Sequence, residues 1–313
     1  MKNKITYKSF LNLYPNDDAR LWALLNARTK DSRVCLNPNC KGNIDRDYKR
    51  LKNKKGFLCV KCLIHVHPLT DSPFDNTKIS LADLFEILYK KLSSSSGMSS
   101  QAIHTYYGFA YSTAHYLSKR IMEHMGQCLD HRFQDTVVEI DESYISTGNK
   151  GLTRHFPFGR GRENMRTTSV LAIVERGGKC ILKKIPDTSA ETIIPIILKH
   201  VDKSCTIHTD QWGAYKSLTK LGYNHFTVNH NNPDKNKKYV DGEASTNSCE
   251  NLFSNLSRLV YGTHRSVSDD LLQHYLDEIA FKHSFRNEID YGLKVFLEEM
   301  APLSSTYSYK LSA

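Results

Sequence analysis

The sequence predicts an α/β protein in which two small N-terminal modules precede a larger α/β domain. Three observations lead to this prediction: a cluster of four cysteines, a following stretch of apolar residues at helical spacing, and a change at about residue 136 to β-branched strands that alternate with helices. The chain has 313 residues, of which 40% are hydrophobic. That length suits two or three domains with buried cores, and the composition excludes a largely disordered protein.

Four of the eight cysteines lie close together in the sequence. Cys35 and Cys40 are followed, after eighteen intervening residues, by Cys59 and Cys62. Two close pairs of soft ligands on tight turns suit one structural Zn²⁺, so the spacing predicts a zinc ribbon. The alternative is a disulfide framework, which requires an oxidising compartment. The remaining cysteines are scattered, and we expect ordinary buried thiols at Cys128, Cys180, Cys205 and Cys249.

Positive charge is concentrated in the first part of the chain. The formal net charge is +10; residues 1–130 hold 20 basic and 11 acidic residues, and residues 131–313 hold 23 and 22. A basic part attached to a nearly neutral remainder indicates polyanion binding, with a basic surface kept for solubility as the alternative. Between the cysteine pairs, the side chains expected to meet DNA phosphates, unless the segment is only a solvated hairpin, are Lys49, Arg50, Lys52, Lys54 and Lys55.

The second module has the pattern of a helix-turn-helix. Apolar residues from Leu81 to Leu92 recur with a helical period, and a serine run ends that helix. A short helix that ends before Gly108 and a longer one over residues 111–125 then predict the helix-turn-helix itself. His115 and Lys119 lie largely off the buried stripe, so we expect them to contact DNA. The alternative is a plain three-helix packing unit.

The third part places acidic residues on strands and helices. A β-branched strand over residues 137–145 carries Glu139 and Asp141, and a later short strand ends on Asp210. A helix from Ser245 onward carries Glu250 in its first turns. A hairpin over residues 169–185 and a helix to about His200 lie between these strands. In the Gly- and Arg-rich loop after the first strand, the arginines expected to line DNA, or else to belong to a disordered basic loop, are Arg154, Arg160, Arg162 and Arg166.

This order of elements is typical of an RNase H-like domain. In such a domain the first acid lies on the central strand, the second just past the fourth strand and the third on a later helix. Phosphoryl transfer through two divalent ions needs carboxylates that converge in this way, and hard oxygen ligands suit Mg²⁺ or Mn²⁺. Glu139 alternates with Asp141 on the same strand face and is therefore its nearest rival for the first position.

Several motifs in this order resemble the DDE transposases of the ISXO-type, Merlin-like insertion-sequence group, which carry an N-terminal zinc ribbon. The resemblance runs from about Cys35 to Arg286. Its motifs, after the cysteine pairs, are Leu69-Thr70-Asp71-Ser72-Pro73-Phe74, Glu139-Ile140-Asp141-Glu142-Ser143-Tyr144, Thr209-Asp210-Gln211-Trp212-Gly213-Ala214-Tyr215, Val228-Asn229-His230, Tyr239-Val240-Asp241, Thr246-Asn247-Ser248-Cys249-Glu250-Asn251-Leu252-Phe253 and Tyr261-Gly262-Thr263-His264.

The resemblance implies a transposase that binds terminal inverted repeats and catalyses DNA cleavage and strand transfer. It implies Asp141, Asp210 and Glu250 as the DDE triad and as ligands of two Mg²⁺ or Mn²⁺ ions. The family commonly has Lys seven residues after the glutamate, whereas this chain has Ser257, followed by a basic residue that can take its place. The residues expected to assist the triad are Glu139, His230, Asn247 and Arg258.

We therefore expect five segments: a helical lead-in (1–30), a zinc ribbon (31–75), a helix-turn-helix region (76–130), an RNase H-like DDE domain (131–290) and a C-terminal tail (291–313). The expected partner is double-stranded DNA, bound by at least a dimer when two ends are synapsed. No apolar run approaches the ~20 residues that span a bilayer, and the first ten residues lack a signal peptide's apolar stretch. We expect a cytoplasmic, nucleoid-associated protein. A nuclease without strand transfer and a non-catalytic zinc-ribbon regulator are the alternatives.

Overall fold

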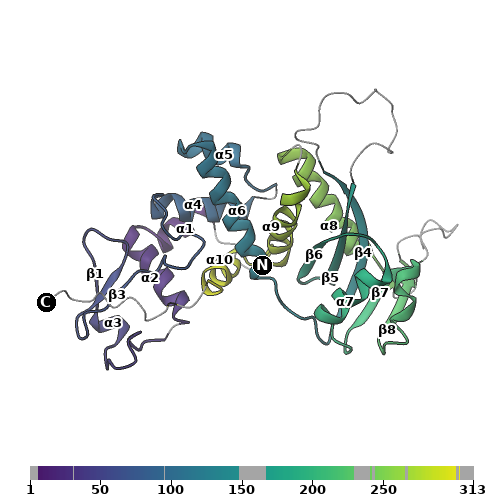
Figure 1. The fold of residues 1–313 in the computed structure, drawn as a ribbon, viewed down its shortest axis with the longest axis horizontal. Coiled ribbons are helices and arrows are strands. Elements are labelled where there is room, and N and C mark those ends of the chain that lie inside the picture. The colour runs from purple at the N-terminus through teal and green to yellow at the C-terminus, as the bar shows by residue number, and fades with distance from the viewer. Residues whose placement is uncertain are drawn as a thin grey trace. The chain divides into compact units, whose positions relative to one another are not determined.

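The chain forms two compact units (Figure 1). The computed structural model describes residues 6–30, 32–94, 96–147, 167–228, 240–241, 244–264, 267–300 and 303. Unit 1 comprises Met1–Ser94, Ser100–Cys128 and Arg286–Ala313, and unit 2 comprises Ser95–Ser99 and Leu129–Phe285. Within the described residues, none of the helices has both the length and the apolar character needed to cross a lipid bilayer.

The N-terminal half of unit 1 combines helices with a small antiparallel sheet of strand order β1-β2-β3. Its elements are α1 (Tyr7–Leu13), α2 (Asp17–Arg28), α3 (Ile44–Asp47), β1 (Tyr48–Arg50), β2 (Phe57–Cys59) and β3 (His65–Val66). The side chain of Asn16 accepts a hydrogen bond from the backbone N–H of Ala19, which sets the start of α2. Trp22 of α2 packs against Phe57 of β2, with ring centroids 4.4 Å apart, so the helix covers the sheet.

The other half of unit 1 is helical. It contains α4 (Leu81–Ser93), α5 (Ser100–Tyr107), α6 (Tyr111–Gln127) and α10 (Ile289–Glu298). The expected helices over residues 81–92 and 111–125 are therefore present. The range 291–313, expected to be a tail, instead begins inside α10. Phe296 of that helix is fully buried, and its carbonyl oxygen lies 2.7 Å from Nε2 of His124 on α6.

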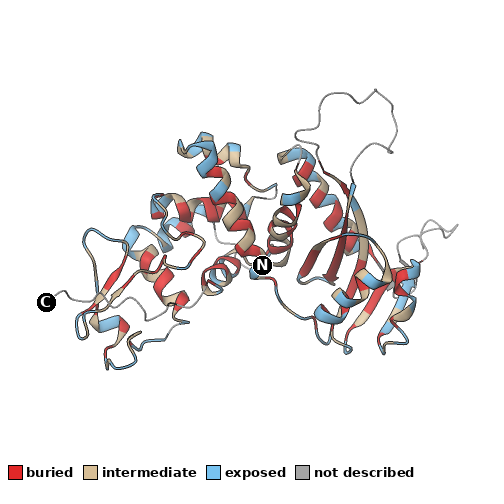
Figure 2. Cartoon of the chain, viewed as in Figure 1, coloured by how far each residue is buried: buried red, intermediate tan, exposed pale blue. Residues whose placement is uncertain are grey.

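Unit 2 is built on a five-stranded mixed sheet of order β6-β5-β4-β7-β8. Its strands are β4 (Val137–Ser146), β5 (Thr167–Glu175), β6 (Cys180–Ile185), β7 (Thr206–Asp210) and β8 (Asn224–Val228). The first three strands pair antiparallel, whereas β7 joins β4 in parallel and β8 joins β7 in parallel. A second, two-stranded sheet pairs β9 (Val240–Asp241) with β10 (Ala244–Ser245). Figure 2 shows buried residues running along the central strands.

Helices pack against both faces of the five-stranded sheet. These elements are α7 (Ala190–His200), the 3-10 helices η2 (Gly213–Ser217) and η5 (Asp269–Leu271), α8 (Asn247–Ser257), the π-helical segment Arg258–Thr263, and α9 (Leu272–Ser284). Val138 and Ile140 of β4 share one core with Ile193 of α7 and Tyr215 of η2. Since strand side chains alternate, Glu139 and Asp141 belong to the opposite face, against which α8 packs.

Helix α7 contains a proline in its interior. The side chain of Ser189 accepts a hydrogen bond from the backbone N–H of Thr192 and caps the helix, so α7 begins at Ala190, five residues before Pro195. The ring of Pro195 is exposed. Because proline has no N–H, it cannot complete the intrahelical bond to the carbonyl of Glu191.

We expect Pro195→Ala to raise the free energy of unfolding by about 2 kcal/mol, because it restores that hydrogen bond without removing buried surface. Chemical denaturation monitored by circular dichroism measures the change. Lys199→Ala on the same helix is the control; its side chain makes only an exposed ion pair with Asp130, so we expect a change within about 0.5 kcal/mol. A Pro195→Ala variant that is less stable than wild type would contradict the conclusion that Pro195 costs α7 a hydrogen bond.

Candidate functional site

Two of the three acids of the expected triad lie on neighbouring parallel strands at the centre of the sheet. Glu139 of β4 is paired in register with His208 of β7. Asp141 and Asp210 each follow two residues later, just beyond the last paired residues of the two strands. Both strands run in the same direction, which brings the two carboxylates to the same edge of the sheet. Each carboxylate is half-buried and accepts a nearby backbone N–H, Asp141 from Glu142 and Asp210 from Trp212.

A fourth carboxylate, Glu142, lies on the opposite face of β4 and is held by η2. The hydroxyl of Tyr215 donates a hydrogen bond of 2.6 Å to its Oε1. Burial raises the pKa of Glu142 to about 7; the charges of Asp141 and Asp210 act in the same direction, against the hydrogen bond from Tyr215. Burial also raises the pKa of Tyr215 well above its usual value. The sequence predicts Glu142 on the other face of the strand, as a helper or a surface acid, but it does not predict the partner Tyr215, because only the fold joins residues so far apart.

Glu139 is buried and makes its contacts within the protein. It is 1% exposed, and its Oε2 accepts the backbone N–H of Ser248, in the first turn of α8, at 2.7 Å. Its Oε1 accepts a hydrogen bond of 3.2 Å from Nε of Arg176. The residue at the N-cap of α8, Thr246, makes no side-chain capping bond. The carboxylate from β4 therefore caps the helix that carries Glu250.

The three acids do not converge as closely as the cysteines do. Among the described residues, the four-cysteine cluster is the one group of three or more potential ligands whose atoms lie within 4.8 Å of one another. Carboxylates that share a site repel each other, and a divalent cation offsets that repulsion. The donor set nonetheless fits a hard cation: Asp141 and Asp210 offer carboxylate oxygens from adjacent strands, and Mg²⁺ and Mn²⁺ prefer oxygen ligands.

The cysteine cluster has the geometry of a tetrahedral site. Sγ of Cys35 lies 3.6 Å from Sγ of Cys62, and Sγ of Cys40 lies 3.9 Å from Sγ of Cys59. A tetrahedron of sulfurs around zinc, with bonds of about 2.3 Å, has edges of about 3.8 Å. All four cysteines are free, and the spacing is far longer than a disulfide bond of about 2.0 Å. The cluster is therefore compatible with zinc and not with the disulfide alternative.

Nearby groups favour ionisation of part of this cluster. Burial raises the pKa of Cys35 to about 12, although the hydroxyl of Tyr48 donates a hydrogen bond to its sulfur. Burial also opposes ionisation of Cys62, but hydrogen bonds from the Ile64 backbone and the neighbouring thiols lower its pKa to about 7. Gly42 lies close beside the cluster: a Cβ there would lie 3.1 Å from Sγ of Cys40 and 3.2 Å from Sγ of Cys59, so a larger residue would press on the sulfurs. Outside the cluster, Cys180, Cys205 and Cys249 are buried and Cys128 is half-buried.

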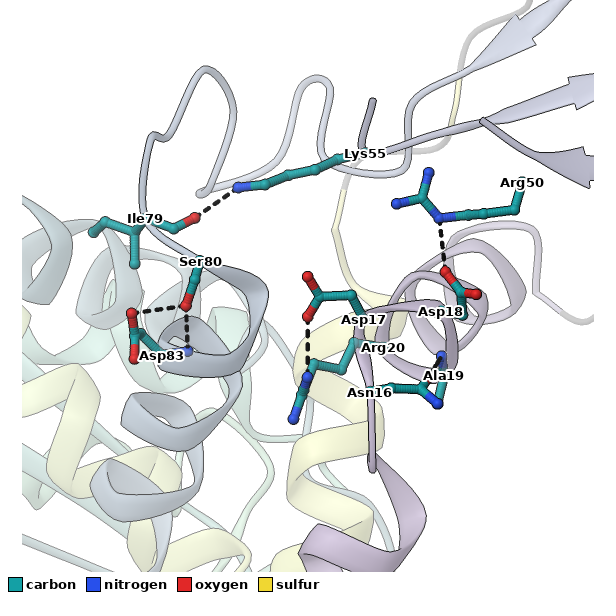
Figure 3. Close-up of polar contacts among 10 residues, drawn as sticks. All are labelled: Asn16, Asp17, Asp18, Ala19, Arg20, Arg50, Lys55, Ile79, Ser80 and Asp83. Carbon is teal, nitrogen blue, oxygen red and sulfur yellow. Dashed lines mark hydrogen bonds and ion pairs between the residues drawn. The ribbon is translucent and has the colours of Figure 1, made fainter. Parts of the chain in front are cut away.

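The basic side chains between the cysteine pairs divide into two groups. Figure 3 shows that Arg50 and Lys55 bind within the protein: Nε of Arg50 lies 3.0 Å from Asp18, and Nζ of Lys55 donates to the carbonyl of Ile79 at 2.6 Å. Arg50 also donates to the carbonyls of Leu51, Lys54 and Gly56. The exposed lysines of this segment are Lys49, Lys52 and Lys54. The two anchored cations fix the hairpin, and the exposed lysines lie on its surface.

The region around the α5–α6 turn presents aromatic side chains. Tyr106 is 72% exposed, and Tyr111 and Tyr116 are also exposed. Of the residues expected to contact DNA, His115 is half-buried beside Tyr111, with ring centroids 6.1 Å apart, and Lys119 forms an ion pair with Glu123. Tyr106 and Tyr111 were not predicted as surface aromatics, although both lie near Gly108 and off the apolar stripe.

The remaining candidate residues lie on α8 or outside the described part of the chain. Asn247 is the exposed first residue of α8, and Arg258 is exposed where the π-helical segment begins. Nη1 of Arg258 lies 3.5 Å from the side-chain oxygen of Asn255. The predicted residues outside the described ranges are Arg154, Arg160, Arg162, Arg166 and His230.

Residues 133–284 match the family described as the ISXO2-like transposase domain. A Halobacterium salinarum protein, described as an uncharacterized protein in transposable element ISH50, is 24% identical over 272 residues, which cover 83% of this chain and 90% of that protein. The chain also matches a crystal structure of a pre-cleavage Mos1 transpososome, over 72% of this chain and 80% of that chain, with 10% identity. The TM-score of 0.21 is too low to establish a shared fold. The family match runs from just before β4 to the end of α9, and the resemblance to an ISXO-type transposase that was predicted from the sequence is confirmed.

Proposed function

We propose that this protein is a transposase that binds terminal inverted repeats and performs divalent-metal-dependent DNA cleavage and strand transfer. The observation that carries the proposal is the placement of Asp141 and Asp210 on adjacent parallel strands at the sheet centre. Glu250 completes the proposed triad from α8, whose first turn is bonded to β4 through Glu139. The family match to residues 133–284 supports the same activity.

The sheet of unit 2 supports an RNase H-like fold. Three antiparallel strands in chain order are followed by two that add in parallel on the other side of the first, which gives the order β6-β5-β4-β7-β8. In that arrangement the first acid lies on the central strand and the second at the end of the fourth. Asp141 on β4 and Asp210 at the end of β7 occupy these positions.

In this proposal Asp141, Asp210 and Glu250 would hold two Mg²⁺ or Mn²⁺ ions. The ions supply activation of the attacking hydroxyl and stabilisation of the leaving oxygen. The protein's own contribution is to hold the Asp141 and Asp210 oxygens on adjacent strands and to orient α8 beneath them. Arg258, one residue after the position of the family's lysine, supplies the cation in this proposal, and Asn247 lies one turn before Glu250.

Unit 1 is the proposed DNA-binding part. It contains the excess positive charge, the cysteine cluster that fits Zn²⁺, and α5 and α6 in the order of a helix-turn-helix. Exposed Lys49 and Lys52 are placed to meet phosphates. Synapsis of two transposon ends then requires at least a dimer, acting on DNA in the nucleoid.

The test of this function uses DNA that carries the element's own flanking repeats, with wild type beside Asp141→Asn. We expect wild type to cleave and join these ends in Mg²⁺ or Mn²⁺, and the variant to lose at least about 100-fold in rate because one metal ligand is lost. Asp270→Asn is the control, since Asp270 is exposed in the same unit. Nicks without joining would indicate a nuclease, and tight binding without cleavage would indicate a DNA-binding regulator.

A second prediction concerns the cysteine cluster. We expect purified protein to contain one Zn²⁺ per chain by elemental analysis. Cys59→Ser should lose that ion and its DNA binding, because the β1–β3 sheet loses the bonds that hold its turns together. Cys128→Ala, outside the cluster, should keep both. A Cys59→Ser variant that binds DNA as wild type does, without zinc, would contradict the assignment of a structural zinc site to the four cysteines.

The third prediction separates the two groups of basic side chains. Lys49→Ala and Lys52→Ala should each lower the slope of log affinity against log salt concentration by about 1, measured by fluorescence anisotropy on any duplex sequence. Arg50→Ala should instead lower the melting temperature of unit 1, because Arg50 binds Asp18 and three carbonyls. Unchanged slopes for both lysine variants would exclude this surface from the DNA interface.

A further inference from the structure

We propose that Glu139 is a positioning residue that holds together the three elements carrying the proposed triad, and that it is not itself a metal ligand. The inference rests on the proposed function, because it assigns Asp141, Asp210 and Glu250 to the metal site. It concerns a layer of hydrogen-bonded polar groups next to those acids, and we define this layer as Glu139, Arg176, His208 and the backbone N–H of Ser248.

Three members of the layer each precede one of the proposed triad acids by two residues in the sequence. Glu139 precedes Asp141 by two residues on β4, His208 precedes Asp210 by two residues on β7, and Ser248 precedes Glu250 by two residues on α8. On a strand, residues two apart share a face and lie about 7 Å apart. The strand members of the layer therefore lie one repeat inside the acids, on the same face of the sheet.

Hydrogen bonds connect all the members of the layer. Oε2 of Glu139 accepts the Ser248 N–H at 2.7 Å, and Oε1 accepts Nε of Arg176 at 3.2 Å. Nη2 of Arg176 in turn lies 3.0 Å from Nδ1 of His208. Since arginine only donates, Nδ1 of His208 is the acceptor and its ring proton is on Nε2. One carboxylate thus links β4 directly to α8 and, through Arg176, to β7.

Burial separates Glu139 from the proposed ligands. Glu139 is 1% exposed and His208 is 2% exposed, whereas Asp141, Asp210 and Glu250 are all half-buried. Each oxygen of Glu139 is already bonded inward, one to a helix N–H and one to a guanidinium. A charged acceptor at a helix N-terminus also interacts favourably with the helix dipole, which α8 needs because Thr246 supplies no side-chain cap.

The consequence is a fixed position for Glu250. The Glu139–Ser248 bond anchors the first turn of α8 to the central strand, and Glu250 is in that same turn. Without the anchor the helix start can shift against β4, and the Glu250 carboxylate moves relative to the Asp141 and Asp210 pair. Loss of groups that orient metal ligands typically costs 10–100-fold in metal affinity.

The experiment measures Mn²⁺ binding to the full-length, zinc-loaded protein by the electron paramagnetic resonance of free Mn²⁺. We expect Glu139→Ala to weaken Mn²⁺ binding by about 10–100-fold and Arg176→Gln to weaken it by less. The affinity for repeat DNA without divalent ions should change less than about threefold, since unit 1 is unaltered. Glu191→Gln, an exposed glutamate on α7, is the matched control and should bind Mn²⁺ as wild type does. Arg176 is 43% exposed, so its variant carries the test if Glu139→Ala does not fold.

Two cysteine variants, Asp141→Cys and Glu139→Cys, distinguish a positioning residue from a metal ligand. Sulfur accepts Mn²⁺ more readily than Mg²⁺, so Asp141→Cys should keep Mn²⁺ binding better than Mg²⁺ binding. Glu139→Cys should weaken both alike, because its side chain does not reach the ion.

Three results would overturn the inference. The first is a Glu139→Cys variant that keeps Mn²⁺ binding while it loses Mg²⁺ binding. The second is wild-type Mn²⁺ affinity both in Arg176→Gln and in a folded Glu139 variant, and the third is a wild type that binds no Mn²⁺ outside the cysteine cluster. A wild type that binds Mn²⁺ but does not cleave DNA would overturn the proposed function alone, and the affinities of the variants would still decide the role of Glu139.

Discussion

The parallel pairing of β4 with β7 is the constraint on which the rest of the site depends. Its register sets Glu139 opposite His208, and Asp141 and Asp210 follow two residues later on the same two strands. A slip of one residue in that pairing would turn every side chain of β7 to the opposite face, so His208 and Asp210 would enter the apolar core around Ile207. The apolar face of the sheet therefore fixes the register, and the register in turn fixes the acids.

The two units are stabilised in different ways. Unit 2 has a continuous apolar core between its sheet and α7, with Val138, Ile140 and Ile207 fully buried. The β1–β3 sheet has strands of only two or three residues, too short to bury a core of that kind. The four cysteines beside its turns fit a Zn²⁺ ion, which would hold those turns in place, and Arg50 and Lys55 fasten the hairpin between the two cysteine pairs. This use of two cations explains why charge alone is a poor guide to which basic residues face a ligand.

The periodic features were predictable from the sequence, and the contacts between distant residues were not. Alternating β-branched residues marked β4 to β6, helical spacing marked α4 and α6, and cysteine spacing marked the cluster. The bond from Glu139 to Ser248 joins residues 109 positions apart, and the pairing of Tyr215 with Glu142 spans 73. No local pattern encodes such contacts. The burial of α10 was missed for the same reason, because its apolar face matters only once α2 and α4 are beside it.

Strand β4 carries three acids within four residues, and their surroundings give each a different role. Burying a carboxylate is costly unless hydrogen bonds compensate it. Glu139 meets that requirement through Ser248 and Arg176, and Glu142 through Tyr215 on the other face. Asp141 is half-buried at the edge where β4 and β7 end their pairing. The two flanking acids thus fasten the strand to the helices on either side of the sheet, and this fixes the position of Asp141 between them.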